Sequence, residues 1–346
     1  MNRQQGFSLI EIMIAITLSL VILLGIVQLF TNMRAVNASQ AGLADLHESA
    51  RFGISTLVGN IRMANNWPII GDPADIVRTS SATIISRGSC DSDWAFDIDR
   101  GIEGFDGSTM PDSTIASCIP FTTDYVPDSD ILIVRHASNN MIDPALTLDP
   151  ASIFYRYNND PGTLSEAILL DGNEANNIPI KIDGGIPQGV QYLYNVSMYY
   201  LRRCDRPVNI STPCGTTNNN RMEPTLARLT LRQNQLVDES IATGVEQIRY
   251  RYGVDTNEDG VVNRYVSAGI INTTAGLDWD QVVSVEIDAL VRSPANSLLA
   301  NDNRTFNFIN GKDVSFAGTS EARFDRQQIR TSIRLRNARR YDIPRR

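Results

Sequence analysis

The feature that most constrains this chain is a long apolar run at its N-terminus. The run begins at Phe7, directly after the polar residues 1–6, and Glu11 is its one ionisable side chain before Phe30. An α-helix rises about 1.5 Å per residue and the hydrocarbon core of a bilayer is about 30 Å thick, so about 20 residues can cross it. The sequence therefore predicts a membrane-spanning helix over residues 7–30.

This helix is expected to continue beyond the membrane as an amphipathic segment. Apolar residues recur at spacings of three, four and seven between Val36 and Ala64, which is the period of one helix face. No proline interrupts the pattern before Pro68, and the residues 65–68 are typical of a helix stop. We expect the amphipathic half, over residues 31–66, to pack on a soluble domain.

Beyond residue 66 the sequence is rich in strand patterns. Apolar and polar residues alternate over Ile248–Tyr252, Val283–Arg292 and Ile329–Arg336. Further strands are expected at Ala82–Arg87, Asp130–His136, Ser152–Tyr157, Gln191–Arg202 and Leu226–Arg232. Such alternation is typical of antiparallel sheets that are covered on one face. The predicted fold class is α+β, with a long N-terminal helix followed by a large, mainly antiparallel β domain over residues 67–346.

The border between the polar start and the apolar run carries a second signal. A secretory signal is cleaved behind its apolar segment, usually after small residues, and residues 28–33 are poor candidates for such a site. The only small residue at a border is Gly6, in front of the run. A carboxylate such as that of Glu11 is costly inside a membrane. A plain signal anchor with an incidental glutamate is the alternative interpretation.

Residues 6–11, Gly-Phe-Ser-Leu-Ile-Glu, resemble the start of a type IV prepilin. The resemblance implies that prepilin peptidase cleaves between Gly6 and Phe7 and that Phe7 is then N-methylated. It implies that the Glu11 carboxylate meets the free amine of a neighbouring subunit during assembly. It also implies a single-pass inner-membrane protein with a cytoplasmic N-terminus and a periplasmic β domain, which later enters the extracellular pilus.

Three later segments, Arg249–Tyr265, Asp278–Ser293 and Arg330–Asn337, resemble the PilW-type minor pilins of Gram-negative bacteria. The strongest match is expected over residues 245–337. The resemblance implies a non-enzymatic subunit that takes part in pilus assembly, in a priming or tip complex. Its expected partners are other minor pilins and the major pilin, contacted through the N-terminal helix, and the inner-membrane assembly platform. The expected units are a leader at 1–6, the two helix halves at 7–30 and 31–66, and the β domain.

Two other functions stay open on the sequence. A pseudopilin of a type II secretion system would share the leader and the helix. A membrane-anchored periplasmic enzyme is the less favoured alternative, because the sequence contains no G-x-S-x-G, P-loop or H-E-x-x-H motif.

Four cysteines, Cys90, Cys118, Cys204 and Cys214, follow the anchor. In an oxidising compartment an even number indicates disulfides, and four cysteines allow three connectivities. We favour the local pairs, Cys90 with Cys118 and Cys204 with Cys214, which leave 27 and 9 residues between the partners. A zinc site is disfavoured because no C-x-x-C motif occurs.

One loop has the residue order of a calcium site. Asp255, Asn257 and Asp259 occupy positions 1, 3 and 5, Gly260 follows, and a carbonyl oxygen of Val261 would serve at position 7. Position 12 lacks the usual glutamate, and the loop lies between two predicted strands rather than two helices. The alternative is a polar turn that needs no ion.

The C-terminal end is rich in arginine, at positions Arg323, Arg326, Arg330, Arg334, Arg336, Arg339, Arg340, Arg345 and Arg346. The chain nevertheless carries a formal net charge of −8, and only Phe324 and Tyr341 interleave as aromatics. We therefore expect a solvated sheet face or a subunit contact there, rather than a nucleic-acid site.

Overall fold

The computed structural model describes residues 8–70, 73–85, 90, 92–107, 113–119, 124–159, 166–205, 214, 222–296 and 301–338. The expected processing site, Gly6 and Phe7, lies outside the described residues, as do the last four arginines of the C-terminal end.

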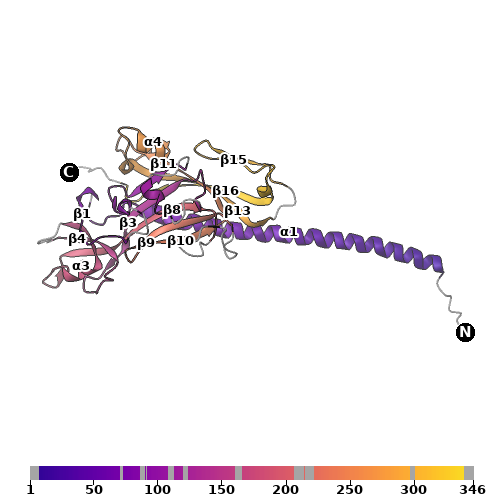
Figure 1. Ribbon diagram of the computed structural model, residues 1–346, viewed down its shortest axis with the longest axis horizontal. Helices are drawn as coiled ribbons and strands as arrows, with labels where there is room; N and C mark the ends of the chain where they lie inside the picture. Colours follow the sequence, from indigo (N-terminus) through magenta and orange to yellow (C-terminus); the bar gives the residue numbers. More distant parts are fainter. Residues whose placement is uncertain are drawn as a thin grey trace.

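The dominant element is one continuous helix, α1 (Leu9–Met63), of 55 residues. Its N-terminal half projects away from the rest of the molecule, and its C-terminal half lies against the strands (Figure 1). The helix ends two residues before the predicted position, because Asn65 adopts a left-handed conformation with φ of 60°. The backbone N–H of Asn65 donates to the carbonyl of Arg135 at 3.1 Å, so the chain turns into the β domain at this residue.

The larger sheet has eight strands in the order β1-β5-β4-β8-β3-β2, with β9 paired to β8 and β10 paired to β9. Only the β1–β5 pair is parallel among the described strands of this sheet. The strands are β1 (Ile76–Arg78), β2 (Ile102–Phe105), β3 (Ile131–Ile142), β4 (Ile153–Asn158), β5 (Ala167–Asp171), β8 (Gly189–Arg202), β9 (Thr225–Arg232) and β10 (Gln235–Thr243).

The smaller sheet is antiparallel throughout, in the order β12-β11-β13-β16. It consists of β11 (Val245–Val254), β12 (Arg264–Val266), β13 (Val282–Asn296) and β16 (Phe324–Arg334). Two short hairpins, β6 (Ile182–Asp183) with β7 (Ile186–Pro187) and β14 (Thr305–Asn307) with β15 (Asp313–Ser315), complete the described strands.

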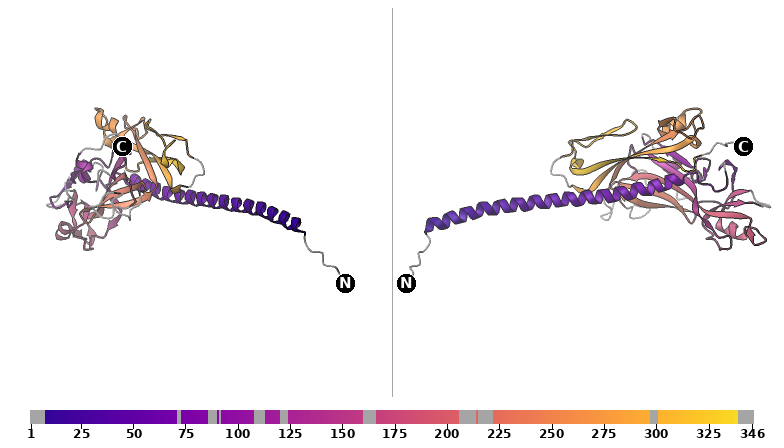
Figure 2. Two further views of the ribbon diagram at one scale, coloured as in Figure 1. Left: turned by 45° about the vertical axis from the view of Figure 1, so that its right-hand side comes forward. Right: turned by 180° about the vertical axis from the view of Figure 1, so that it is seen from behind.

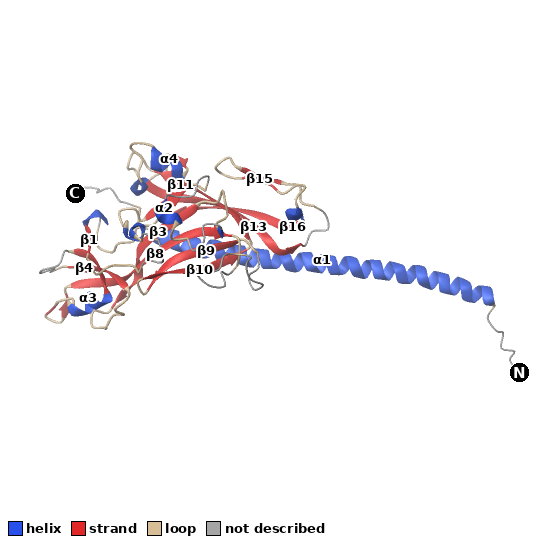
Figure 3. Cartoon of the chain, in the orientation of Figure 1, coloured by secondary structure: helices blue, strands red, loops and turns tan. Residues whose placement is uncertain are grey.

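Helices other than α1 are short and sit in the connections between strands (Figure 3). They are α2 (Ser113–Ala116), α3 (Gly172–Asn177) and α4 (Ala268–Thr273), with 3-10 turns η1 (Pro73–Asp75), η2 (Asp93–Phe96), η4 (Trp279–Gln281) and η5 (Ser320–Arg323). The α+β class predicted from the sequence is confirmed.

The C-terminal half of α1 shares one hydrophobic core with both sheets. Leu57 and Ile61 of the helix are fully buried together with Val134 of β3, Ile248 of β11 and Val285 of β13. The right-hand view of Figure 2 shows the helix running across the strands. A second core covers the opposite face of the larger sheet and contains Trp67, which is buried. Burial of these side chains holds the helix and both sheets together.

The described strands correct two expectations from the sequence. Residues 82–85 form no strand and contribute only an isolated bridge from Ile85 to Gln235. The polar face of the β11–β13 pair is also not open to solvent, since Arg249 is 2 % exposed and Asp288 is 0 % exposed. Alternation identified these strands correctly but could not show that their polar face was buried as well.

Candidate functional site

The N-terminal half of α1 is a rod of exposed apolar side chains. A stretch of 26 residues, Leu9–Arg34, is long and apolar enough to cross a membrane, and none of it is buried within the molecule. Leu9, Val21 and Leu24 each expose 70 % or more of their surface. Apolar surface of this extent requires lipid or other apolar helices around it.

Glu11 is the single charged side chain on this rod before Arg34. Its Oε2 atom accepts a hydrogen bond from the Ser8 backbone N–H at 3.1 Å, at the first turn of α1. Free backbone N–H groups and the positive end of the helix dipole gather at this end, and both favour a carboxylate. A second cationic group, such as an amine from another chain, can approach the same carboxylate because the side chain is exposed.

The other end of α1 is locked to the β domain by two asparagines that sequence reasoning missed. Asn65 donates from Nδ2 to the carbonyl of Asn337 at 3.2 Å, and Asn337 donates from Nδ2 to the carbonyl of Ala64 at 3.5 Å. We call this pair the asparagine clasp. It joins the helix end to the chain just after β16, across 272 residues, so that no local sequence signal could have indicated it.

The structure joins Cys90 to Cys118 and Cys204 to Cys214, which are the two local pairs favoured on the sequence. The first bridge is buried in the second core, where Trp94 donates from its indole nitrogen to the sulfur of Cys118 at 3.3 Å. Cys90 and Cys118 both lie outside the described strands, whereas Cys204 comes two residues after the end of β8.

The loop predicted to bind calcium is held by its own hydrogen bonds. The carboxylate of Asp255 accepts from the backbone N–H of Asn257 at 3.2 Å, of Glu258 at 2.8 Å and of Gly260 at 2.6 Å. Asp259 accepts from the Val261 N–H at 2.8 Å. No group of three or more His, Cys, Asp or Glu side chains suited to a metal occurs in the described ranges. The loop can therefore keep its shape without an ion, and calcium binding stays a prediction.

The arginines of β16 are solvated at Arg330 and Arg334, as the sequence predicted, whereas Arg326 is buried. Arg326 is 2 % exposed and binds the carboxylate of Glu246 through Nε at 2.6 Å and Nη2 at 3.0 Å. Arg330 donates from Nε to Asp288 at 3.0 Å, and Arg334 donates to the carbonyl of Gly260 at 2.9 Å.

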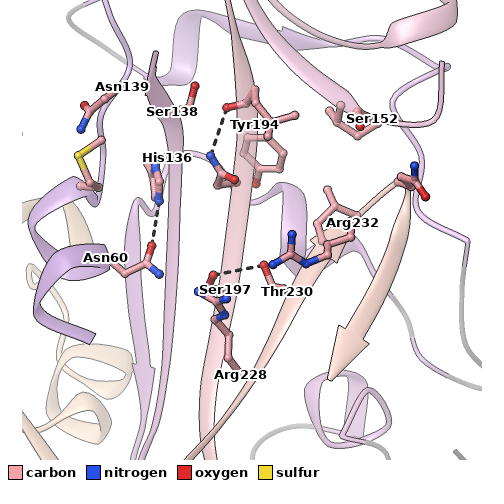
Figure 4. Close-up of a pocket in the computed structure, with 16 residues that line it drawn as sticks. Asn60, His136, Ser138, Asn139, Ser152, Tyr194, Ser197, Arg228, Thr230 and Arg232 are labelled. Atoms are coloured by element: carbon pink, nitrogen blue, oxygen red, sulfur yellow. Dashed lines mark hydrogen bonds between the residues drawn. The ribbon is translucent and has the colours of Figure 1, made fainter. Parts of the chain in front are cut away.

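A polar hollow of about 560 Å³ lies between the last turn of α1 and strands β3, β8 and β9 (Figure 4). At one side, His136 of β3 has Nε2 at 3.0 Å from Oδ1 of Asn60, and its Nδ1 is 2.9 Å from the Ala137 carbonyl. Burial lowers the pKa of His136, so the imidazole is largely neutral near physiological pH. Arg228 and Arg232 line the opposite side.

Comparison with known protein families gives two matches. Residues 1–27 match the prokaryotic N-terminal methylation motif, and residues 214–337 match the family of type IV pilus-assembly protein W, PilW. The second match extends further toward the N-terminus than the expected 245–337 and includes β9, β10 and the whole smaller sheet. No curated protein and no solved structure gives a significant match.

The two matched segments meet in the architecture described above. The described part of the methylation-motif match, residues 8–27, forms the start of the exposed apolar half of α1, and the PilW match covers strands that pack on the buried half of this helix. A membrane-anchored helix, a β-rich domain and disulfides are thus combined with both family signatures. Both family matches support a type IV pilin of the PilW family.

Proposed function

We propose that this chain is a minor pilin, a low-abundance structural subunit that helps to start pilus assembly together with other minor pilins. The single observation that carries the proposal is the continuous helix α1, whose exposed apolar half bears one carboxylate and whose other half is built into the β domain. A subunit of this shape can be held in lipid and then transferred to a bundle of similar helices without refolding.

The proposal includes processing and topology. Prepilin peptidase removes residues 1–6 on the cytoplasmic side, Phe7 is N-methylated, and the β domain lies in the periplasm before it enters the pilus. The match of residues 1–27 to the methylation motif supports this order of events. The match to a pilus-assembly family supports a pilus over a secretion pseudopilus. The chain acts in this scheme as a structural component and not as an enzyme.

Glu11 is the residue that we assign to assembly. In the apolar interior of a helix bundle the local dielectric is low, so a carboxylate attracts a neighbouring amine strongly. Glu11→Gln keeps the size and polarity of the side chain but removes its charge. We expect normal cleavage and normal membrane levels of the variant, with at least a tenfold loss of the subunit from sheared pili.

The measurement is quantitative mass spectrometry of sheared pili and of membranes from cells expressing the wild type or Glu11→Gln. Ser19→Ala serves as the matched control, because Ser19 lies on the same side of α1 and its hydroxyl bonds only the Ala15 carbonyl, at 2.7 Å. Copy numbers equal to those of the major subunit would contradict the minor role. Wild-type incorporation of Glu11→Gln would contradict the assembly role of the carboxylate.

A further inference from the structure

On the side of the larger sheet that faces α1, the side chains change from apolar to polar where the helix ends. The change occurs on the three strands β3, β8 and β9. In β3, the apolar Leu132 and Val134 are followed by His136 and Ser138. In β8, Leu201 and Tyr199 are replaced by Ser197 and Asn195, and in β9 Leu226 is followed by Arg228 and Thr230. The alternation of side chains places each of these sets on one face. On each strand, the polar residues therefore begin where α1 no longer covers the sheet.

The floor of the polar hollow is nevertheless recessed rather than exposed. Ser197 is 4 % exposed, His136 is 7 % exposed and Thr230 is 8 % exposed. Thr230 donates from its hydroxyl to the Val196 carbonyl at 3.0 Å and lies 3.5 Å from the Ser197 hydroxyl. Ligand sites are concave and hold a few placed polar groups that orient the ligand, and these recessed hydroxyl and imidazole groups can serve in that way.

The strands that flank β8 open this cavity. β4 pairs with β8 as far as Leu193, and β9 pairs with it from Ser197 onward. The three residues between these points, 194–196, pair with neither β4 nor β9. The hollow is therefore produced by the arrangement of strands.

The charge of the polar hollow is positive. Arg228 and Arg232 are its charged lining residues, and no carboxylate lines it. Both arginines share Glu239, whose carboxylate accepts from Nε of Arg228 at 3.2 Å and from Nε of Arg232 at 2.7 Å. The Arg232 side chain is 60 % exposed, and within the described part of the chain only its Nε is engaged. The outer nitrogens of its guanidinium can therefore bind a carboxylate.

We propose that the polar hollow binds an acidic saccharide, a sugar unit that carries a carboxylate. The carboxylate binds Arg232, the ring hydroxyls bond the amides of Asn60 and Asn195 and the hydroxyl of Ser197, and an apolar ring face lies on Leu193. Leu193 lines the hollow and is 37 % exposed, so apolar surface is available there. This binding is separate from the role of α1 in pilus assembly and can be tested on the isolated protein.

The lining favours a saccharide over an acidic peptide. Amide and hydroxyl side chains both donate and accept hydrogen bonds, as sugar hydroxyls do, whereas a carboxylate side chain only accepts. The hydroxyls of a sugar therefore match more of the hydrogen-bonding groups of the polar hollow than one peptide carboxylate does.

The test is calorimetric titration of the full-length protein in detergent micelles with trigalacturonate. The neutral trisaccharide maltotriose and the peptide triglutamate are titrated in parallel. We expect saturable binding of trigalacturonate, at least tenfold weaker binding of maltotriose and no saturable binding of triglutamate. Arg232→Ala is expected to weaken trigalacturonate binding at least tenfold, while Arg264→Ala, an exposed arginine on β12 outside the hollow, leaves it unchanged.

A second variant separates charge from shape. Asn195→Asp keeps the side-chain volume but places a negative charge in the polar hollow, so trigalacturonate binding should fall more steeply than maltotriose binding. The proposal is overturned if trigalacturonate shows no saturable binding at millimolar concentration. It is also overturned if Arg232→Ala binds as the wild type does, or if triglutamate binds as tightly as the saccharide.

Discussion

Asp130, directly before β3, links the larger sheet to β11 of the smaller sheet. Its side chain is 2 % exposed, and its Oδ1 accepts from Arg249 at 2.8 Å and from the Gly107 N–H at 3.0 Å. Its Oδ2 accepts from the Tyr250 N–H at 2.8 Å. Removal of this carboxylate leaves a buried arginine without its counter-charge, which costs about 3–5 kcal/mol.

We therefore expect Asp130→Ala to lower the free energy of unfolding by about 3–5 kcal/mol. Urea denaturation of the full chain in detergent, followed by tryptophan fluorescence, measures the change. Asp183→Ala on the exposed β6–β7 hairpin is the control and should change the free energy by less than about 0.5 kcal/mol. Equal stability of the two variants would contradict the account of this ion pair.

Asp255 tests whether the loop between β11 and β12 uses calcium. Because the Asp255 carboxylate accepts from three backbone N–H groups, Asp255→Ala should lower the melting temperature of the full chain even in EDTA. If the predicted calcium site exists, added calcium will raise the melting temperature of the wild type and leave that of Asp255→Ala unchanged. Identical wild-type melting in calcium and in EDTA removes the calcium prediction and leaves the structural role of Asp255 intact.

At the scale of elements, the asparagine clasp fixes the position of α1 on the β domain. Asn65→Ala removes the bond to Asn337 and the bond from the Trp67 indole, 3.0 Å long, and it also places alanine at a positive φ. We expect a loss of about 2–3 kcal/mol in the free energy of unfolding.

Asn65→Gly separates the two contributions, because glycine adopts this φ freely and lacks only the side-chain bonds. Its loss should be about 1 kcal/mol smaller than that of Asn65→Ala. Urea denaturation measures both. If Asn65→Gly is as destabilised as Asn65→Ala, the backbone conformation of residue 65 contributes nothing and this part of the account is wrong.

Elements with a strong local pattern were predictable from the sequence. The apolar run and its amphipathic continuation predicted α1 almost to its last residue, and alternation predicted β11, β13 and β16. β5 (Ala167–Asp171) was missed because a short, fully buried strand shows no alternation, and β10 was missed because polar residues interrupt its pattern. Local patterns identify elements but carry little information on what covers them.

The candidate sites also divide into those that the sequence predicted and those that only the fold brings together. The cysteine pairs followed from spacing along the chain, and Glu11 was singled out by the resemblance of residues 6–11 to a prepilin. The asparagine clasp, the Asp130–Arg249 ion pair and the polar hollow each join segments more than a hundred residues apart or several strands at once. Their residues are ordinary in the sequence, and only the pairing of strands brings them together.

At the scale of the whole molecule, α1 and the β domain act as one body. The helix contributes Leu46, Leu57 and Ile61 to a core that contains residues of both sheets, so a force on the helix is transmitted to the whole domain. The exposed half carries no comparable contact with the described part of the domain. This division suits a subunit that leaves the membrane as a unit once its N-terminus has been processed.

The central claim is that the chain is processed as a pilin, and intact mass combined with N-terminal sequencing of the protein recovered from membranes tests it most directly. The account predicts a mature chain that begins at N-methylated Phe7 and whose mass corresponds to two closed disulfides. Recovery of a chain that still carries residues 1–6, from cells that process their other pilus subunits, would contradict it.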